Sequence, residues 1–152
     1  MPKVFIGADH RGYALKERLK AYLGNKGFVV EDQGAFEEDP SDDYPDFALP
    51  VARAVASDLD SRGILLCGSG MGMDVVANKV RGVRATVGYS PESVIHARKH
   101  DDINVITLAA DVENAADVER LADLFLATSF SGEERHVRRL KKITAIEDDA
   151  CS

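Results

Sequence analysis

The sequence predicts a doubly wound α/β fold, because five short apolar runs alternate with stretches of helical periodicity. The runs are apolar throughout rather than alternating, which is typical of a mainly parallel sheet covered by helices on both faces. Right-handed crossovers through those helices would connect successive strands. The expected strands are Val4 to Ala8, Phe28 to Val30, Ile64 to Leu66, Val83 to Val87 and Val105 to Leu108.

Helices are expected between these strands. In the first, Leu15, Leu19 and Leu23 share one face, and Gly24 and Gly27 act as stop signals. A glycine-rich loop at 67–72 leads into another helix that extends toward Lys79. The remaining helices are expected at about 47–58, 90–100, 115–126 and 134–146.

Proline marks two helix starts. Ser90 and Pro91 are read as an N-cap and a first helical residue. Pro50 is expected to delay the secure start of the helix at 47–58, because proline cannot donate an interior backbone hydrogen bond.

Length and composition favour one domain over residues 1–152, since 152 residues with 45% apolar content can bury a sizeable core. The stretch from about residue 148, with Cys151, is expected to be a mobile tail.

Two cysteines far apart make no disulfide framework, so a reducing cytoplasm is the expected compartment. A net charge of −7 argues against nucleic acid, and we find no secretory signal and no run long enough to span a membrane.

Ligands of such folds bind beyond the carboxyl ends of the strands. Asp9, His10, Arg11 and Gly12 follow the first strand, either as a capped turn or as part of a site. The loop from Cys67 to Gly72 follows the third strand, and its glycines let the backbone approach a negatively charged ligand. A tight turn with a buried cysteine is the alternative.

Several other glycine-loop functions are excluded by position. A dinucleotide fingerprint should follow the first strand, and a P-loop would end in Gly-Lys-Ser/Thr. A thiol phosphatase would have an arginine closing the loop, and none occurs between Cys67 and Lys79. A thiol beside amide donors suits proton transfer, so Cys67 is a candidate general base.

The strongest positive charge lies in Arg135-His136-Val137-Arg138-Arg139-Leu140-Lys141-Lys142, where Arg135, Arg139 and Lys142 share a helical face. This face is either solvated or a phosphate anchor. His100, at the end of its helix, either interacts with the helix dipole or belongs to a site.

In order and spacing, six segments resemble the ribose-5-phosphate isomerase B and galactose-6-phosphate isomerase family over nearly the whole chain. The segments are Gly7-Ala8-Asp9-His10, Asp43-Tyr44-Pro45-Asp46, Cys67-Gly68-Ser69-Gly70-Met71-Gly72, Ala77-Asn78-Lys79, Ala97-Arg98-Lys99-His100 and Arg135-His136-Val137-Arg138-Arg139. The resemblance implies a Rossmann-like three-layer α/β/α sandwich and a homodimer with active sites at the subunit interface, with a tetramer left open. It also implies aldose-ketose conversion through an enediolate, without metal or cofactor.

The resemblance implies roles for individual residues. Cys67 would be the base, and Ser69 would help the loop amides stabilise the enediolate. Asp9 and His100 would open the sugar ring. The other site residues it implies are His10, Arg135 and Arg139 for phosphate, Tyr44 and Arg98 around the substrate, the loop residues Gly68, Gly70, Met71 and Gly72, and Asp101.

Two positions depart from the family pattern or decide between its branches. Asp101 stands where asparagine is common, and Met73 stands where one branch has a glutamate base. Met73 leaves Cys67 as the candidate base, and the change at Asp101 bears on the sugar more than on the reaction type. The resemblance implies ribose 5-phosphate as the substrate, with allose 6-phosphate, galactose 6-phosphate or a tetrose phosphate as alternatives. A non-catalytic phosphometabolite-binding module is a second reading, and a phosphoacceptor receiver domain a weaker third, because Cys67 stands where its aspartate should be.

Overall fold

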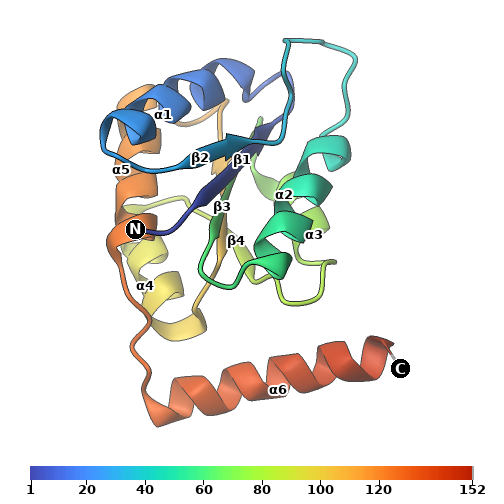
Figure 1. Ribbon diagram of the computed structural model, residues 1–152, viewed down its shortest axis with the longest axis vertical. Helices are drawn as coiled ribbons and strands as arrows, with labels where there is room; N and C mark the ends of the chain where they lie inside the picture. Colours follow the sequence, from blue (N-terminus) through green and yellow to red (C-terminus); the bar gives the residue numbers. More distant parts are fainter. Residues whose placement is uncertain (152) are drawn as a thin grey trace.

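Five parallel strands form one sheet in the order β2-β1-β3-β5-β4 in the computed structural model, which describes residues 1–151 (Figure 1). The strands are β1 (Val4–Ala8), β2 (Val30–Asp32), β3 (Arg62–Cys67), β4 (Ala85–Val87) and β5 (Val105–Ala109). The helices are α1 (Tyr13–Asn25), α2 (Pro45–Ser57), α3 (Met71–Ala77), α4 (Pro91–Asp101), α5 (Ala115–Ala127) and α6 (Glu134–Cys151).

Helices cover both faces of the sheet, which confirms the predicted three-layer α/β/α arrangement. Successive strand residues point to opposite faces, so Ile64 packs beneath α1, α4 and α5, whereas Leu65 packs beneath α2 and α3. Both are fully buried. This is why the strands are apolar at every position rather than at every second one.

The strand order of the sheet reverses between β1 and β3, which makes this the topological switch point. β2 is added on one side of β1, whereas β3 and the later strands lie on the other. Ala8 pairs with Leu66, so the residues after them, Asp9 and Cys67, leave neighbouring strand ends. A crevice between diverging loops forms at such a point, and ligands of open α/β sheets bind there.

Strand β1 has the predicted bounds, whereas the other four strands differ from the predicted bounds by one or two residues. β2 begins at Val30 rather than Phe28, because pairing with β1 begins where Val4 meets Val30, and Val29 before it is 66% exposed. β4 begins at Ala85 rather than Val83, since its pairing with β5 starts at Ala85.

The predicted late start of α2 was wrong. The helix begins at Pro45 and continues through Pro50. Proline at the first position leaves no donor unused, and Pro50 removes only one interior hydrogen bond. Ala48, Val51 and Val55 on the buried face keep the helix against the sheet despite that loss.

The predicted start of α4 is confirmed, since Ser90 is the N-cap and forms a reciprocal capping box with Ser93.

Near the C-terminal end of the sequence, α6 continues through the residues for which the sequence predicts a tail from about 148. α6 crosses below the rest of the molecule and covers neither face of the sheet (Figure 1). None of the helices within residues 1–151 has the length and apolarity needed to span a membrane.

Candidate active site

Cys67 ends β3 with its sulfur at the base of the glycine-rich loop. The side chain is 4% exposed and contacts the core under α2 and α3, as the alternative reading of a buried strand-end cysteine requires. The sulfur also accepts a hydrogen bond from the backbone N–H of Gly70 at 3.2 Å. Gly70 takes a positive φ of 75°, which turns the chain back over the sulfur and starts α3. The thiol is therefore both buried and enclosed by its own loop.

Two other loop glycines allow side chains to lie directly on the backbone. A Cβ at Gly72 would lie 2.7 Å from Cζ of Tyr44, so the tyrosine ring covers this residue. A Cβ at Gly68 would lie 2.6 Å from Oδ2 of Asp111 and 2.9 Å from Nε of Arg11. The loop is thus overlaid by Tyr44, from the start of α2, and by an ion pair joining the ends of β1 and β5.

That ion pair was not recognised in the sequence. Nη2 of Arg11 lies 2.6 Å from Oδ2 of Asp111, although the two residues are 100 positions apart. Only the meeting of the β1 and β5 ends above β3 brings them together. No local pattern in the sequence predicts such a pairing.

The two other loop residues expected at the site, Ser69 and Met71, are exposed. Ser69 accepts a hydrogen bond from the N–H of Met71 at 3.2 Å through Oγ, and the Met71 side chain is 66% exposed. Both lie on the outer rim of the loop, where a ligand would first arrive.

Asp9 lies directly after β1 and is 5% exposed. Its Oδ1 accepts hydrogen bonds from the N–H groups of Arg11 at 3.0 Å and Gly12 at 3.2 Å, so the capped-turn reading is correct. Burial raises the pKa of Asp9, although the two backbone hydrogen bonds oppose the shift. A carboxyl group with a raised pKa at a strand end is also a candidate for proton transfer.

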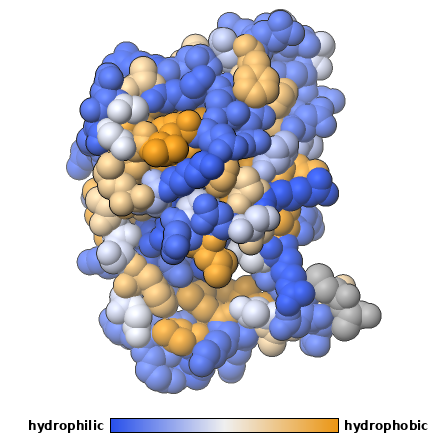
Figure 2. Space-filling model, viewed as in Figure 1, coloured by the Kyte–Doolittle hydropathy of each residue, from blue (hydrophilic) through white to orange (hydrophobic). Residues whose placement is uncertain are grey.

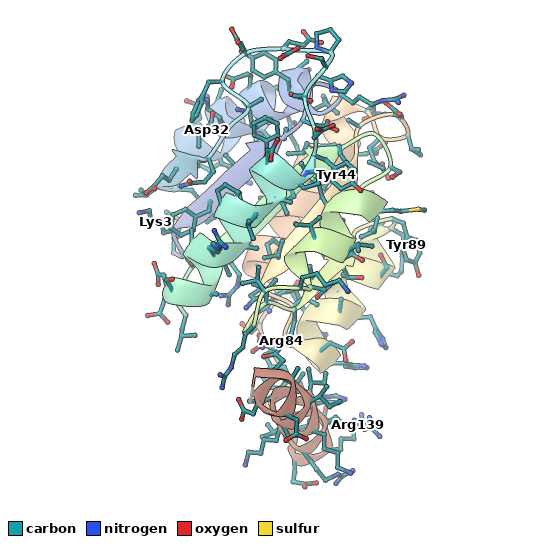
Figure 3. All side chains as sticks on the ribbon, turned by 90° about the vertical axis from the view of Figure 1, so that its right-hand side faces the viewer. Lys3, Asp32, Tyr44, Arg84, Tyr89 and Arg139 are labelled. Atoms are coloured by element: carbon teal, nitrogen blue, oxygen red, sulfur yellow. The ribbon has the colours of Figure 1, made fainter. Side chains whose placement is uncertain are left out.

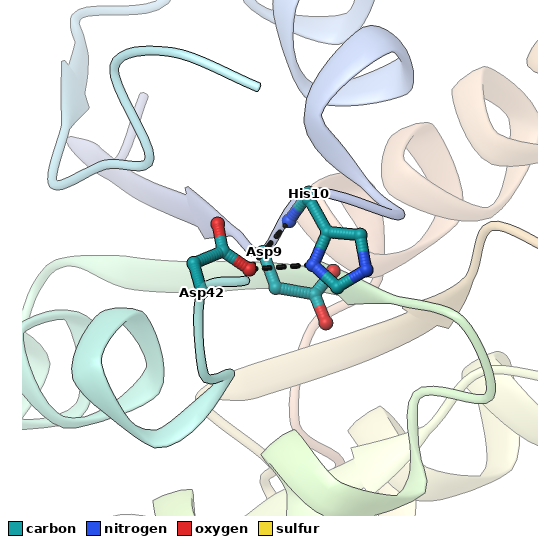
Figure 4. A group of neighbouring side chains, drawn as sticks. All are labelled: Asp9, His10 and Asp42. Atoms are coloured by element: carbon teal, nitrogen blue, oxygen red, sulfur yellow. Dashed lines mark hydrogen bonds and ion pairs between the residues drawn. The ribbon is translucent and has the colours of Figure 1, made fainter. Parts of the chain in front are cut away.

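His10 is held by a residue that sequence reasoning missed. Asp42 lies in the loop before α2. Its Oδ1 accepts a hydrogen bond from the backbone N–H of His10 at 3.0 Å and lies 2.6 Å from Nδ1 of the His10 ring (Figure 4). The hydrogen bond to Asp42 raises the pKa of His10. Asp42 stands just before the Asp43-Tyr44-Pro45 segment, but the sequence gives no sign that it folds back 32 residues.

His100 belongs to a different cluster. It lies in the last turn of α4, where its ring stacks on that of His136 at 4.3 Å and meets that of His96 edge-on at 4.1 Å. His136 in the first turn of α6 is 2% exposed, and its Nδ1 lies 2.7 Å from Oγ of Ser131. Burial, together with the neighbouring histidines, lowers the pKa of His100.

The basic residues of α6 and the end of α4 lie near this histidine cluster. Arg135 is exposed, with Nε 3.1 Å from Glu133, and Arg139 is also exposed. Asp101 is exposed beside His100. The exposed side chains of all three are accessible to a ligand or another chain.

Arg98 is 3% exposed and serves its own chain. Its Nε donates to the carbonyl of Thr128 at 3.0 Å, and Nη1 pairs with Oδ1 of Asp102 at 2.8 Å. These bonds tie the end of α4 to the segment after α5. The structure therefore places Arg98 as a buried brace rather than beside the other site residues.

The expected site residues form two groups at opposite ends of the sheet. Asp9, His10, Tyr44 and the 67–72 loop lie at the carboxyl ends of the strands. His100 precedes β5 and therefore lies at the amino ends, as do Asp101 and the arginines of α6. Tyr44 and Arg139, labelled in Figure 3, show this separation. Within one chain, the residues at the carboxyl ends of the strands and those at the amino ends therefore do not lie together.

The fold and the first group define a class of protein. A parallel α/β sheet whose switch point carries a thiol, an amide-rich loop, a buried carboxyl group and a carboxylate-bound histidine is a site for chemistry on a small anionic metabolite. A family model described as Ribose/Galactose Isomerase matches residues 4–143, and the chain belongs to this family.

Individual relatives agree over nearly their whole length. The chain is 38% identical over 147 residues to ribose-5-phosphate isomerase B of Escherichia coli, covering 97% of each protein. It is 37% identical over 145 residues to the enzyme of the same name from Mycolicibacterium paratuberculosis, covering 95% of this chain and 91% of that one.

Solved structures of the family superpose closely. Ribose-5-phosphate isomerase B from Mycoplasma genitalium, with bound ribulose-5-phosphate, gives a TM-score of 0.93 at 40% identity and covers 96% of each chain. The enzyme from Clostridium thermocellum gives 0.93 at 39% identity, covering 97% of this chain and 99% of that one.

Proposed function

We propose that the protein is an aldose-ketose isomerase that interconverts ribose 5-phosphate and ribulose 5-phosphate without a metal or cofactor. The observation that carries the proposal is the Cys67 thiol at the switch point, with a loop amide directed at its sulfur. Family membership and the names of the relatives support the choice of reaction and of sugar.

Cys67 acts as the base in this proposal. As a thiolate it removes the proton from C2 of the open-chain aldose, and the electron pair moves to the carbonyl oxygen to form an enediolate. Return of the proton to C1, with transfer between the two oxygens, gives the ketose. The amides of the 68–72 loop and the hydroxyl of Ser69 donate hydrogen bonds to the developing oxyanion. Because Cys67 is buried, the loop must open slightly for the sugar to reach the sulfur.

Ring opening needs one group that gives a proton and one that takes a proton. Burial raises the pKa of Asp9, which favours its protonated form, and lowers the pKa of His100, which favours its neutral form. Opposite shifts on two candidate groups are what an acid and base pair requires. The proposal assigns ring opening to Asp9 and His100.

The separation of the two groups of residues leads to a homodimer. A second copy of the chain that brought its α4 and α6 ends to the 67–72 loop would complete each site, with Arg135 and Arg139 as phosphate ligands. α6 leaves Ile143 41% and Ile146 69% exposed, and Figure 2 shows hydrophobic residues where α6 faces the body of the molecule. An apolar helix face with so little cover within its own chain suits a subunit interface. We infer a cytoplasmic location from the reduced thiol that the mechanism requires.

The first test is the replacement Cys67→Ala. We expect turnover of ribose 5-phosphate to be abolished while binding of the sugar phosphate is retained, because only the base is removed. NMR detection of deuterium uptake at the sugar carbon in heavy water measures the proton abstraction itself. Cys151→Ala, which removes the chain's other thiol, is the control and should exchange at the wild-type rate. Normal exchange in Cys67→Ala would remove the thiol from the mechanism.

A non-catalytic sugar-phosphate-binding module is the second candidate, favoured by the burial of Cys67 and by the exposed carboxylate of Asp101 beside His100. The wild-type protein decides between the two. A binding module would show ligand-induced shifts without deuterium uptake. Turnover compared across the phosphates of ribose, allose, galactose and erythrose then identifies the sugar.

A further inference from the structure

Asp42 is an acid with a largely buried side chain, outside the residues assigned to catalysis above. It lies in the loop between β2 and α2, and its side chain is 9% exposed. Oδ1 faces both the backbone N–H and the ring Nδ1 of His10, whereas Oδ2 is buried with no hydrogen-bond partner among the described residues. A buried carboxylate that uses only one of its oxygens is costly unless a cation lies beside it.

His10 is the group positioned to supply that positive charge. The hydrogen bond to Asp42 and the negative charge of that carboxylate favour its protonated form, and Asp9 adds to this when it is ionised. Burial of the ring and the charge of Arg11 oppose it. Asp39, on the same loop as Asp42, also feels the charge of His10. Ligand atoms of Asp9, His10 and Asp42 all lie within 4.8 Å of one another, so both acidic side chains lie close to the ring (Figure 4).

The pairing also decides which ring nitrogen faces outward. An ionised carboxylate can only accept, so Nδ1 of His10 must carry the hydrogen. Nε2 then lies on the far side of the ring from Asp42, as Figure 4 shows. No hydrogen bond to Nε2 occurs within the described part of the chain, and the side chain is 29% exposed. Nε2 is the end of His10 that a ligand can reach.

We propose that Asp42 is a positioning residue for substrate binding, holding His10 through Nδ1 so that Nε2 presents a proton to the phosphate of the sugar. The inference rests on the proposed isomerase function and adds a residue to it. A charged donor binds a phosphate oxygen more strongly than a neutral imidazole, whose Nε2 would be an acceptor and would repel the anion.

The sign of the pH effect follows from the direction of the shift. Because the pKa of His10 is raised, the imidazolium and its pairing with Asp42 are present below the ordinary histidine range and are lost as the pH rises through the raised value. Phosphate affinity should fall over the same window. Without the carboxylate of Asp42, that window should lie at lower pH.

The test is Asp42→Asn, which keeps the shape and one acceptor oxygen but removes the charge. We expect KM for ribose 5-phosphate to rise by about tenfold at neutral pH, as loss of a hydrogen bond to a charged group predicts, with kcat little changed. The rise in KM should shrink at lower pH, where His10 is protonated in both proteins. Glu38→Gln, which removes one exposed charge from the same loop, is the matched control and should behave as wild type.

A purely structural role for Asp42 gives a different pattern. If Asp42 only anchors the loop, Asp42→Asn should lower kcat or stability without moving the pH dependence of KM, and the proposal is overturned. Equal effects of Asp42→Asn and Glu38→Gln would also overturn it, because the effect would then be one of net charge.

A second measurement does not depend on turnover and is made on the wild-type protein, with one variant used only to assign a signal. Long-range proton–nitrogen NMR spectra report the protonation of each histidine ring, and His10→Asn assigns the signal of His10. We expect His10 to keep a protonated ring to higher pH than His100 and to respond to added inorganic phosphate. A ring of His10 that loses its proton at or below the pH at which His100 does, or that ignores phosphate, refutes the role of Asp42. If the wild type isomerises no sugar phosphate, the proposed function fails, while the ring titration still decides on Asp42.

Discussion

At the scale of single residues, the site depends on glycines that permit close contacts. Gly12 shows this most clearly, because a Cβ there would lie 2.4 Å from the carbonyl oxygen of Leu66 in β3. The turn after β1 therefore lies directly against the backbone of β3, which sets Asp9 beside the Cys67 loop. Glycine is required here for space, since its φ of −95° is one that any residue adopts.

Gly12→Ala should lower the free energy of unfolding by about 1–3 kcal/mol, because the obstructing atoms belong to backbone that cannot turn aside. Gly24→Ala in α1 is the matched control. A Cβ there meets nothing within 4 Å, so the same substitution should be neutral or stabilise the protein by up to about 1 kcal/mol. Urea denaturation of both variants measures the difference. Equal stability of the two would show that the turn does not lie so close to β3.

At the scale of elements, a helix start with a local cap was easier to predict than the start of a strand. Ser90 and Pro91 identify the start of α4 because capping is a local interaction between neighbours in the chain. The start of β2 depends instead on where Val4 in β1 meets it, so the sequence placed the strand two residues too early. The predicted late start of α2 at Pro50 was wrong for a similar reason, because the packing of α2 on the sheet, a contact between distant segments, outweighs one missing hydrogen bond.

Ser90→Ala tests the cap of α4. Oγ of Ser90 accepts from the N–H of Ser93 at 3.1 Å, and removing it leaves that donor unsatisfied. We expect the free energy of unfolding to fall by about 1 kcal/mol, with ring contacts of His100 at the other end of the helix preserved. Thermal and urea denaturation give the stability, and Ser90→Asp should restore it as a replacement cap. A loss that Ser90→Asp does not recover would contradict the capping role.

At the scale of the whole molecule, the position of α6 is the central feature. It crosses beneath the amino ends of the strands, with Arg139 far from Tyr44 (Figure 3). Its bonds to the rest of the chain include the N–H of Gly82 to Glu147 at 3.0 Å and an ion pair between Arg81 and Asp148. In the proposed dimer, the two groups of site residues would meet between chains.

Mixing two impaired variants, assayed at low substrate concentration, tests whether sites are shared. Cys67→Ala removes the base at one end of the chain, and Arg139→Ala removes a phosphate ligand at the other. If each site uses both chains, dimers formed from one copy of each variant hold one intact site and one doubly damaged site. Random reassociation should then restore about a quarter of wild-type turnover for a two-fold symmetric dimer.

Turnover after unfolding and refolding the two variants together is the measurement, and refolding each alone is the control. No recovery in the mixture, while refolded wild type is active, would place each complete site within one chain. Sedimentation of the wild type gives the size of the assembly independently.

The sequence by itself determined what depends on neighbours along the chain. Apolar runs and helical periodicity gave the parallel three-layer fold, and Asp9 and Cys67 were identified because residues that follow parallel strands gather at one edge. Only the tertiary structure decided what depends on contacts between distant segments. The Asp42–His10 pair joins residues 32 positions apart, and Arg11 meets Asp111 across 100. Likewise, the burial of Arg98 and the separation of His100 from Cys67 follow from how helices and strands meet in space, which no local pattern encodes.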